Sequence, residues 1–460
     1  MMQVLEPTQA DREIIECLLN KQSFSVVAGA GSGKTTSLVT ALNFLRDEYG
    51  TELRQNGQKI VCITYTKRAT AVIEERLGFD DLYLVSTIHS FLWSAINRFT
   101  KDISTALHEY LIPAHITKSR ERDNGGNSQA ARRARERVAE LEAELDLLDQ
   151  VTLFKYDESQ FSSFSKGLIG HDDVIDLAAY LISQKPILQR GLGFQYPYIF
   201  VDEAQDTFDN VVAAFNQVCT GEGLPIVGYF GDPMQQIYDN GLGNFDGPAG
   251  FRQIDKEENF RSATSIVALT NKLRTDIQQR PAGDSALIEG SVLLTLIEAE
   301  APAAPRGRYT PEQLDSTLVK FDQALELIGW ENNEEAKRLF LVRQMIARRL
   351  GFSTLQNLFT GRYASGKAKD QYIDGDHFLL KPFVKSLCPL MVAMQEGNSR
   401  QIVDILREHT PAFDIAGKNK NRPLKEMLDS ANTLIGELAD MWQNRPIGAI
   451  LKFAQNNSLC

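Results

Sequence analysis

The sequence lacks a long hydrophobic run, paired cysteines and an excess of positive charge. Within its 460 residues no apolar stretch approaches the roughly 20 residues that cross a bilayer as a helix. The N-terminus MMQVLEPTQADREII is too acidic and polar for a signal peptide. The five cysteines are scattered without a C-x-x-C pair, which argues against a zinc site, an iron–sulfur cluster or a disulfide framework. We therefore expect a cytoplasmic protein with reduced thiols and no membrane partner.

Charge and length set two further limits. The formal net charge of -11 gives no attraction of the whole molecule to a polyanion. A nucleic acid would therefore have to be held by local patches. A chain of this length is expected to fold into two or more domains.

A glycine-rich segment follows an apolar run near the N-terminus. Residues 24–28, FSVVA, are typical of a buried strand, and the next residues read GAGSGKTT. The glycines allow successive backbone N–H groups to converge on one point, Lys34 supplies a cation, and Thr35 supplies a hydroxyl for Mg²⁺. The pattern predicts a cradle for a polyphosphate. The candidate nucleotide-binding residues are Ala28, Gly29, Ala30, Gly31, Ser32, Gly33, Lys34, Thr35 and Thr36.

Two adjacent acids follow another apolar run. Residues 198–201 predict a short strand, and Asp202 and Glu203 come directly after it. Asp202 is suited to hold Mg²⁺, and Glu203 is suited to orient and deprotonate an attacking water. Two acids at the end of a buried strand are costly without a cation. The sequence therefore predicts an enzyme that hydrolyses a polyphosphate with Mg²⁺.

Four segments carry a resemblance to a known family. AGAGSGKTT, DEAQDT, GDPMQQIY and ENFRS, in this order, resemble the signatures of the UvrD/Rep family of superfamily 1 DNA helicases. LEPTQ at residues 5–9 is similar to the adenine-reading motif of that family, in which Ala28 is a common variant. Residues 63–77 and 86–96 resemble its two segments that contact single-stranded DNA. The resemblance covers about the first 270 residues. Residues 337–352 resemble, more weakly, a strand and helix of the family's second motor domain.

The resemblance implies that the polyphosphate is ATP, and it implies a role for each matching residue. Gln9 and Phe260 would contact the adenine. Gln235 would sense the γ-phosphate, and Arg261 would reach it as an arginine finger. Gln205 would link the magnesium site to that sensor. The residues implied to contact unpaired bases are Thr64, Tyr65 and His89, although Tyr65 is also compatible with an ordinary packed aromatic and His89 with a helix-cap histidine.

The sequence also departs from the family pattern. The family's tryptophan after the third motif is missing, with Phe245 the nearest aromatic residue, and Thr36 stands where the family often has an arginine. No segment matches the two late motifs of the VHxxKGLE and LTRA types, so we expect either a truncated form of a helicase or a protein that works with half of the usual machinery. The complete acid pair favours an ATP-driven helicase or translocase on single-stranded or partly duplex DNA. The missing late motifs favour a nucleotide-gated DNA-binding subunit of a repair or phage-defence complex, which would work with a protein partner and not unwind DNA independently.

The order of apolar runs predicts an α/β fold. Strand-like runs at 24–28, 59–64, 82–86, 198–202 and 225–230 alternate with helical stretches, as in a RecA-like parallel sheet of a P-loop NTPase. We expect a first motor domain over residues 1–100 and 166–258. A helical insertion is expected at 101–165, a partial second motor domain at 259–360 with a strand at 291–299, and a mainly helical region at 361–460.

The insertion contains a helix whose charges oppose its dipole. Apolar residues recur at three- and four-residue spacings from Ala131 to Leu148, while arginines lie toward the start and acids toward the end. An antiparallel partner helix, DNA phosphates or a solvated arm would each fit this pattern.

Overall fold

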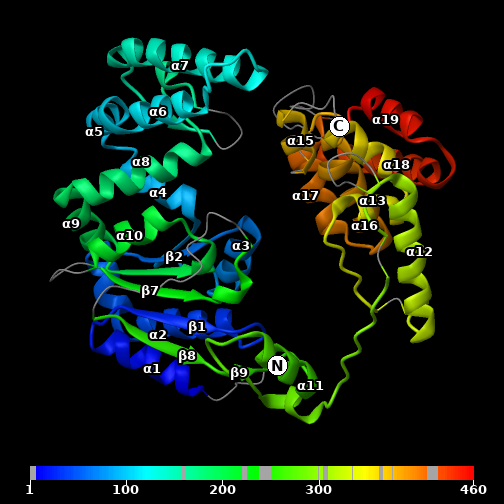
Figure 1. Cartoon of the computed structure of the whole chain (residues 1–460), viewed down its shortest axis with the longest axis horizontal. Coiled ribbons are helices and arrows are strands. Elements are labelled where there is room, and N and C mark those ends of the chain that lie inside the picture. The colour runs from blue at the N-terminus through cyan, green and yellow to red at the C-terminus, as the bar shows by residue number, and fades with distance from the viewer. Residues whose placement is uncertain are drawn as a thin grey trace. The chain divides into compact units, whose positions relative to one another are not determined.

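The computed structural model describes residues 7–157, 162–219, 225–237, 250–298, 300–303, 309–333, 335–361, 366–373, 375, 377–411 and 423–459. The chain divides into two compact units, Met1–Leu293 and Leu294–Cys460, and each unit is described here by itself (Figure 1).

A six-stranded parallel sheet forms the centre of the first unit. Its order is β3-β2-β6-β7-β1-β8, and every neighbouring pair runs parallel. The strands are β1 (Phe24–Ala28), β2 (Ile60–Thr64), β3 (Tyr83–Thr87), β6 (Tyr198–Asp202), β7 (Ile226–Gly231) and β8 (Arg252–Lys256). The predicted RecA-like α/β fold is thus confirmed, and each of the five predicted strands is found.

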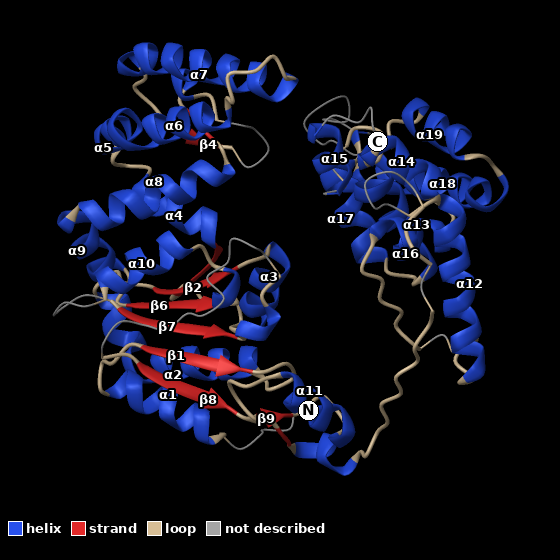
Figure 2. Cartoon of the chain, in the orientation of Figure 1, coloured by secondary structure: helices blue, strands red, loops and turns tan. Residues whose placement is uncertain are grey.

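Helices cover both faces of this sheet (Figure 2). Successive side chains of β6 point to opposite faces, so that Tyr198 and Phe200 enter one apolar core and Ile199 and Val201 enter the other. Burial on both faces explains why the strands are continuous apolar runs. The covering helices are α1 (Gln9–Leu19), α2 (Lys34–Gln55), α3 (Lys67–Arg76), α4 (Ile88–Ile96) and α10 (Asp209–Val218). Two further helices lie outside this layer: α8 (His171–Gln184) packs on α4 and α10, and α9 (Pro186–Gln195) packs on α8 and α10.

The predicted insertion is helical. It holds α5 (Thr100–Ala106), α6 (Ile112–Arg122) and α7 (Gln129–Leu147), followed by the short parallel pair β4 (Lys155–Tyr156) and β5 (Leu168–Ile169). The apolar seam of α7 is buried at Ala131, Ala134 and Leu141.

An antiparallel partner for α7 is provided by α6, which precedes it in a helical hairpin. Ion pairs join the two sides, at 2.8 Å between Arg120 and Glu142 and at 2.7 Å between Arg135 and Asp123. Of the three explanations for the charge pattern of α7, the structure therefore provides the partner helix.

The first unit ends in a small lobe after β8. It contains β9 (Glu258–Asn259), α11 (Thr264–Leu273) and β10 (Arg280–Pro281), with β9 and β10 pairing parallel. The compact unit runs to Leu293, beyond the predicted boundary after residue 258, and the division into four domains stays a prediction.

The strand expected at 291–299 is not found in its described part. Residues 291–298 form no strand, and Leu294 and Leu296 are 80% and 86% exposed. Their sequence has the composition of a strand, but none of the described strands pairs with it.

The second unit is mainly helical, as predicted for most of it. Its helices are α12 (Pro311–Leu327), α13 (Arg343–Arg349), α14 (Ser353–Thr360), α15 (Gly366–Ile373), α16 (Cys388–Gln395), α17 (Ser399–His409), α18 (Leu424–Asn444) and α19 (Ile447–Asn456). The helix that was expected within residues 337–352 corresponds to α13, but the strand expected before it is absent, because residues 337–341 form no strand. Of the helices within the described ranges, none has the length and apolar character needed to span a bilayer.

Candidate nucleotide-binding site

The loop between β1 and α2 has the backbone of a phosphate cradle. Gly31 and Gly33 have φ angles of +77° and +80°, which residues with a side chain rarely adopt. A Cβ on Gly31 would also lie 2.8 Å from Asn259 Oδ1, so the space is closed. Gly33 caps the N-terminus of the 22-residue helix α2, whose first N–H groups and positive dipole end favour an anion.

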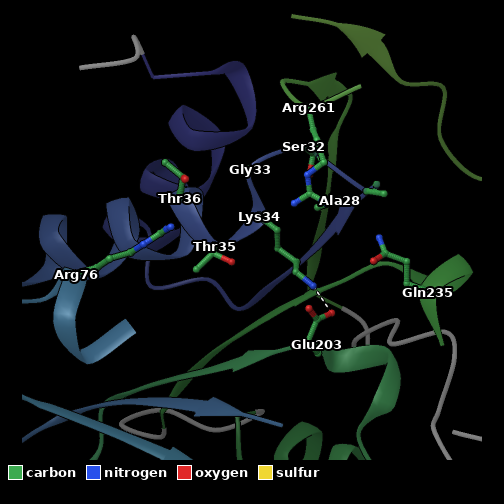
Figure 3. Close-up of a pocket in the computed structure, with 13 residues that line it drawn as sticks. Ala28, Ser32, Gly33, Lys34, Thr35, Thr36, Arg76, Glu203, Gln235 and Arg261 are labelled. Carbon is green, nitrogen blue, oxygen red and sulfur yellow. Dashed lines mark hydrogen bonds and ion pairs between the residues drawn. The ribbon is translucent and has the colours of Figure 1, made fainter. Parts of the chain in front are cut away.

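A cavity of about 230 Å³ opens above this loop (Figure 3). Its walls include every predicted residue of the loop, from Ala28 to Thr36. Glu203, Gln235 and Arg261 complete the wall together with Arg76, which the sequence analysis did not single out. The structure therefore brings the predicted loop, base, sensor and arginine finger to one cavity.

The acid pair lies where β6 ends, opposite Lys34. The ammonium of Lys34 contacts the Glu203 carboxylate and lies 3.7 Å from Asp202 Oδ1 (Figure 3). Burial raises the pKa of Asp202, and the Lys34 charge offsets this only in part. Burial alone would also raise the pKa of Glu203, but Lys34 and the Gln205 amide outweigh it and hold that pKa below its usual value.

Glu203 also has an unusual backbone. Its φ of +52° lies in the left-handed region, where a non-glycine residue costs about 1–3 kcal/mol. Such residues concentrate at functional sites, because the surrounding structure must hold them there. The position of this carboxylate is therefore imposed by the fold and not chosen by local preference.

Gln205 connects the acid pair to the turn that carries Gln235. Its amide donates to Glu203 Oε2 at 2.9 Å, and its carbonyl oxygen accepts from the backbone N–H of Asp232 at 3.0 Å. Asp232 in turn accepts from the Gln235 amide at 2.6 Å. The link from the acid pair to the Gln235 turn that the resemblance implied is thus present as hydrogen bonds.

The predicted adenine contacts do not line the cavity. Gln9 is exposed and donates to Glu13 at 2.9 Å. Phe260 lies beside the loop, with its ring 3.8 Å from the position of a Cβ on Gly33. Both remain predictions for the adenine. Leu5 and Glu6 of the motif, and Phe245, lie outside the described residues.

The three candidate DNA residues lie near the same edge of the sheet but differ in access. Thr64 is 1% exposed, and its hydroxyl is 2.9 Å from that of Thr70. His89 is also buried and stacks on His171 with ring centroids 3.3 Å apart. Burial and the neighbouring His171 lower the pKa of His89 to about 3, which keeps it neutral. Tyr65, half-buried at the end of β2, is the most accessible of the three.

Comparison with known proteins supports the family resemblance. The model of the UvrD/REP helicase N-terminal domain matches residues 8–245, about half of the chain. The chain belongs to the UvrD/REP helicase family. Helicases of this family bind DNA and use ATP with Mg²⁺.

Two curated relatives carry the name Gabija protein GajB. The one from Bacillus cereus strain HuB5-5 is 28% identical over 54% of this chain and 46% of its own length. The one from strain VD045 is 25% identical over 54% of this chain and 45% of its own length. The chain therefore spans about half the length of the curated relatives it matches.

The donors at this UvrD/REP-type site fit a magnesium ion bridged to phosphates. Thr35 offers a hydroxyl, and Asp202 offers a carboxylate that burial deprives of water. Within the described ranges no cluster of three histidine, cysteine or acidic residues forms a metal cage. Mg²⁺ at nucleotide sites keeps waters and phosphate oxygens as most of its ligands, so two protein donors are sufficient.

Arg76 is the member of the cavity wall that sequence reasoning missed. It lies in the last turn of α3, inside the segment 63–77 that was matched to DNA contacts. One signal in the sequence could have indicated it: UvrD/REP helicases often have an arginine at the position of Thr36, and this chain lacks it there. Arg76 brings a guanidinium to the same cavity from a different helix (Figure 3).

Replacing Arg76 with alanine is expected to weaken ATP binding by about 10- to 100-fold, because a hydrogen bond to a charged group contributes about 1.5–3 kcal/mol. Titration with a fluorescent ATP analogue in the absence of DNA measures this change. Arg68→Ala is the matched control, since Arg68 is exposed on the same helix and does not line the cavity. Equal affinities for the parent and Arg76→Ala would show that Arg76 makes no contact with the nucleotide.

Proposed function

We propose that this chain is a cytoplasmic ATP-driven translocase of the helicase type that moves on single-stranded DNA. The observation that carries the proposal is the cavity that joins the phosphate loop to Glu203. One wall offers N–H groups, a lysine and a hydroxyl for a triphosphate, and the other offers a carboxylate that the fold keeps ionised. Binding alone would not require that carboxylate, whereas hydrolysis does.

Each residue of the cavity has a distinct task in this proposal. The loop and Lys34 hold the phosphates, and Glu203 takes the proton of the attacking water. Bound Mg²⁺ supplies positive charge that stabilises the charge developing on the phosphates. Gln235 and Arg261 meet the terminal phosphate from different sides of the cavity, so their positions depend on the nucleotide state (Figure 3). Because these positions change with the nucleotide state, ATP turnover can change the affinity of the chain for DNA.

Phosphate release by the purified chain, measured with and without a single-stranded DNA oligomer, tests the proposal. We expect Mg²⁺-dependent hydrolysis that the oligomer accelerates. A hydrolysis rate that is unaffected by DNA would contradict the proposal that the chain is a translocase. A complete absence of hydrolysis would also contradict the proposal that it is an enzyme.

Replacing Tyr65 with alanine is expected to weaken binding of a single-stranded oligomer, because a stacked base contributes about 1–3 kcal/mol. Fluorescence anisotropy at fixed salt measures the change. The matched control is Phe79→Ala. Phe79 is 74% exposed and precedes β3, so it lies at the end of the sheet where the strands begin, whereas Tyr65 lies where they end. The assignment of residues 63–77 to DNA would be wrong if both variants bound as tightly as the parent.

A second candidate function is a nucleotide-gated DNA-binding subunit without independent unwinding. One observation favours it: the two curated relatives carry the name Gabija protein GajB. By this reading the chain would act with a protein partner in a repair or phage-defence assembly. A strand-displacement assay on the chain alone separates the two candidates, because efficient unwinding excludes the second.

A further inference from the structure

The small lobe after β8 fastens to the back of the phosphate loop. Asn259 and Gln279 both donate their side-chain amides to the carbonyl oxygen of Ala30, at 2.8 and 3.2 Å. The backbone N–H of Phe260 donates to the carbonyl oxygen of Gly31 at 2.9 Å. The loop is therefore held from the side away from the cavity by residues far along the chain.

Arg274, directly after α11, is the buried cation of this lobe. It is 7% exposed and donates to Asp232 at 2.9 Å and to Asp276 at 2.7 Å. A Cβ on Gly29 would lie 2.6 Å from its guanidinium, so Arg274 packs directly against the first glycine of the loop. It does not line the cavity and is therefore out of place for contact with the nucleotide.

Asp232, the partner of Arg274, holds the turn that carries Gln235. It is 1% exposed and accepts hydrogen bonds from the Gln235 amide at 2.6 Å and from the backbone N–H of Met234 at 3.1 Å. The same residue bonds Gln205, which bonds Glu203. A single residue therefore connects Arg274 to both the predicted sensor and the predicted base, to Gln235 through its carboxylate and to Gln205 through its backbone N–H.

We propose that Arg274 is a positioning residue that fixes Gln235, through Asp232, at a set place relative to the phosphate loop. This deepens the proposed function and rests on it. The planar guanidinium suits the task, because it binds two carboxylates at once while one of its nitrogens lies against Gly29. Lysine, with one compact charge, cannot hold both carboxylates in the same geometry.

The first test compares turnover with binding. Arg274→Lys keeps a charge beside Asp232 and is expected to bind a fluorescent ATP analogue like the parent, while kcat for phosphate release falls by about 10- to 100-fold, since a small misplacement of a reacting group has effects of that size. Arg280→Lys is the matched control, because Arg280 lies in the same lobe but is 61% exposed at its side chain. Unchanged kcat in Arg274→Lys would overturn the proposal.

A double-variant cycle tests whether Arg274 acts through Gln235. If it does, Arg274→Lys should lower kcat in the parent but cause little further loss in a Gln235→Ala background. Equal losses in both backgrounds would show that Arg274 supports the fold and not the sensor.

Hydrogen exchange gives a readout that needs no hydrolysis. In Arg274→Lys the peptide covering residues 226–237 is expected to exchange faster than in the parent and in Arg280→Lys. Unchanged exchange overturns the inference even if the parent hydrolyses no ATP, whereas faster exchange in a chain without hydrolysis would sustain the link and refute only the proposed function.

Discussion

Replacing Glu203 with glutamine is expected to lower the rate of ATP hydrolysis by about 10²- to 10⁴-fold, the usual contribution of a positioned general base. Glutamine has nearly the same shape and still orients a water, but it takes up no proton. ATP affinity should stay close to that of the parent, because the loop and Lys34 are unchanged. Steady-state phosphate release and titration with a fluorescent ATP analogue measure the two effects separately.

Glu52→Gln is the control for this experiment, since Glu52 is an exposed acid near the C-terminal end of α2, far along the helix from the phosphate loop. It should hydrolyse ATP at the parent rate. If Glu203→Gln did so too, the base would have to be another group, and the placement of Glu203 opposite Lys34 would have only a structural meaning.

The same carboxylate makes a prediction about pH. In the free protein Lys34 and Gln205 keep the pKa of Glu203 below its usual value. Bound phosphates draw the Lys34 ammonium toward themselves, which weakens its hold on Glu203 and lets that pKa rise. The acidic limb of kcat, which reports the complex, should therefore lie at higher pH than that of kcat/KM, which reports the free protein.

The pKa shifts of Glu203 and Asp202 also predict how the stability of the protein depends on pH. A depressed pKa means that the Lys34–Glu203 contact contributes stability above the ordinary glutamate pKa of about 4.3, and that this contribution is lost as the pH falls through the lower folded value. Asp202 acts in the opposite direction. Because burial raises its pKa, the charged form is disfavoured in the fold, and stability is gained as the pH falls through the folded pKa, in full below the ordinary aspartate pKa of about 3.9.

The strands of the motor core were predictable because of where they lie. β1 and β6 begin and end at the predicted residues, since a strand buried on both faces must be apolar along its whole length and polar or glycine residues must follow it. Residues 291–298 have the same kind of sequence and form no strand. A strand needs a neighbour to bond to, and an apolar pattern carries no information on whether that neighbour is present.

Some residues of the site could be predicted from the sequence and others could not. The phosphate loop and the acid pair are local patterns, so the sequence places them correctly on the ends of β1 and β6. Arg76 and Arg274 reach the loop only through the packing of α3 and of the lobe after β8. The burial of His89 depends on His171, which belongs to another helix. Contacts of this kind have no spacing rule, and the structure is needed to find them.

Replacing Lys34 with alanine is expected to abolish detectable ATP binding. Lys34 is the cation of the loop itself, and its ammonium lies between the loop and the acid pair, where the phosphates must pass. Without it, a triphosphate entering the cavity would meet two carboxylates with no intervening positive charge. Titration with a fluorescent ATP analogue in the presence of Mg²⁺ measures the loss.

Lys34→Ala also removes the cation that pairs with Asp202 and Glu203. The resulting loss of folding stability must be measured separately from the loss of ATP binding. Asp202 is 6% exposed, and breaking a buried ion pair by removal of one partner typically destabilises a protein by about 3–5 kcal/mol. The loss here should be at the lower end, because Asp202 already has a raised pKa and can take up a proton. Thermal unfolding of Lys34→Ala beside the parent measures it.

The double variant Lys34→Ala/Asp202→Asn separates the two effects. The amide removes the repulsion with Glu203 and the uncompensated charge at the end of β6, so the double variant should unfold at a higher temperature than Lys34→Ala. It should still bind no ATP, because the cation for the phosphates is absent. Recovery of binding together with stability would mean that Lys34 serves the acid pair and not the nucleotide, and the cavity above the phosphate loop would then need a different ligand.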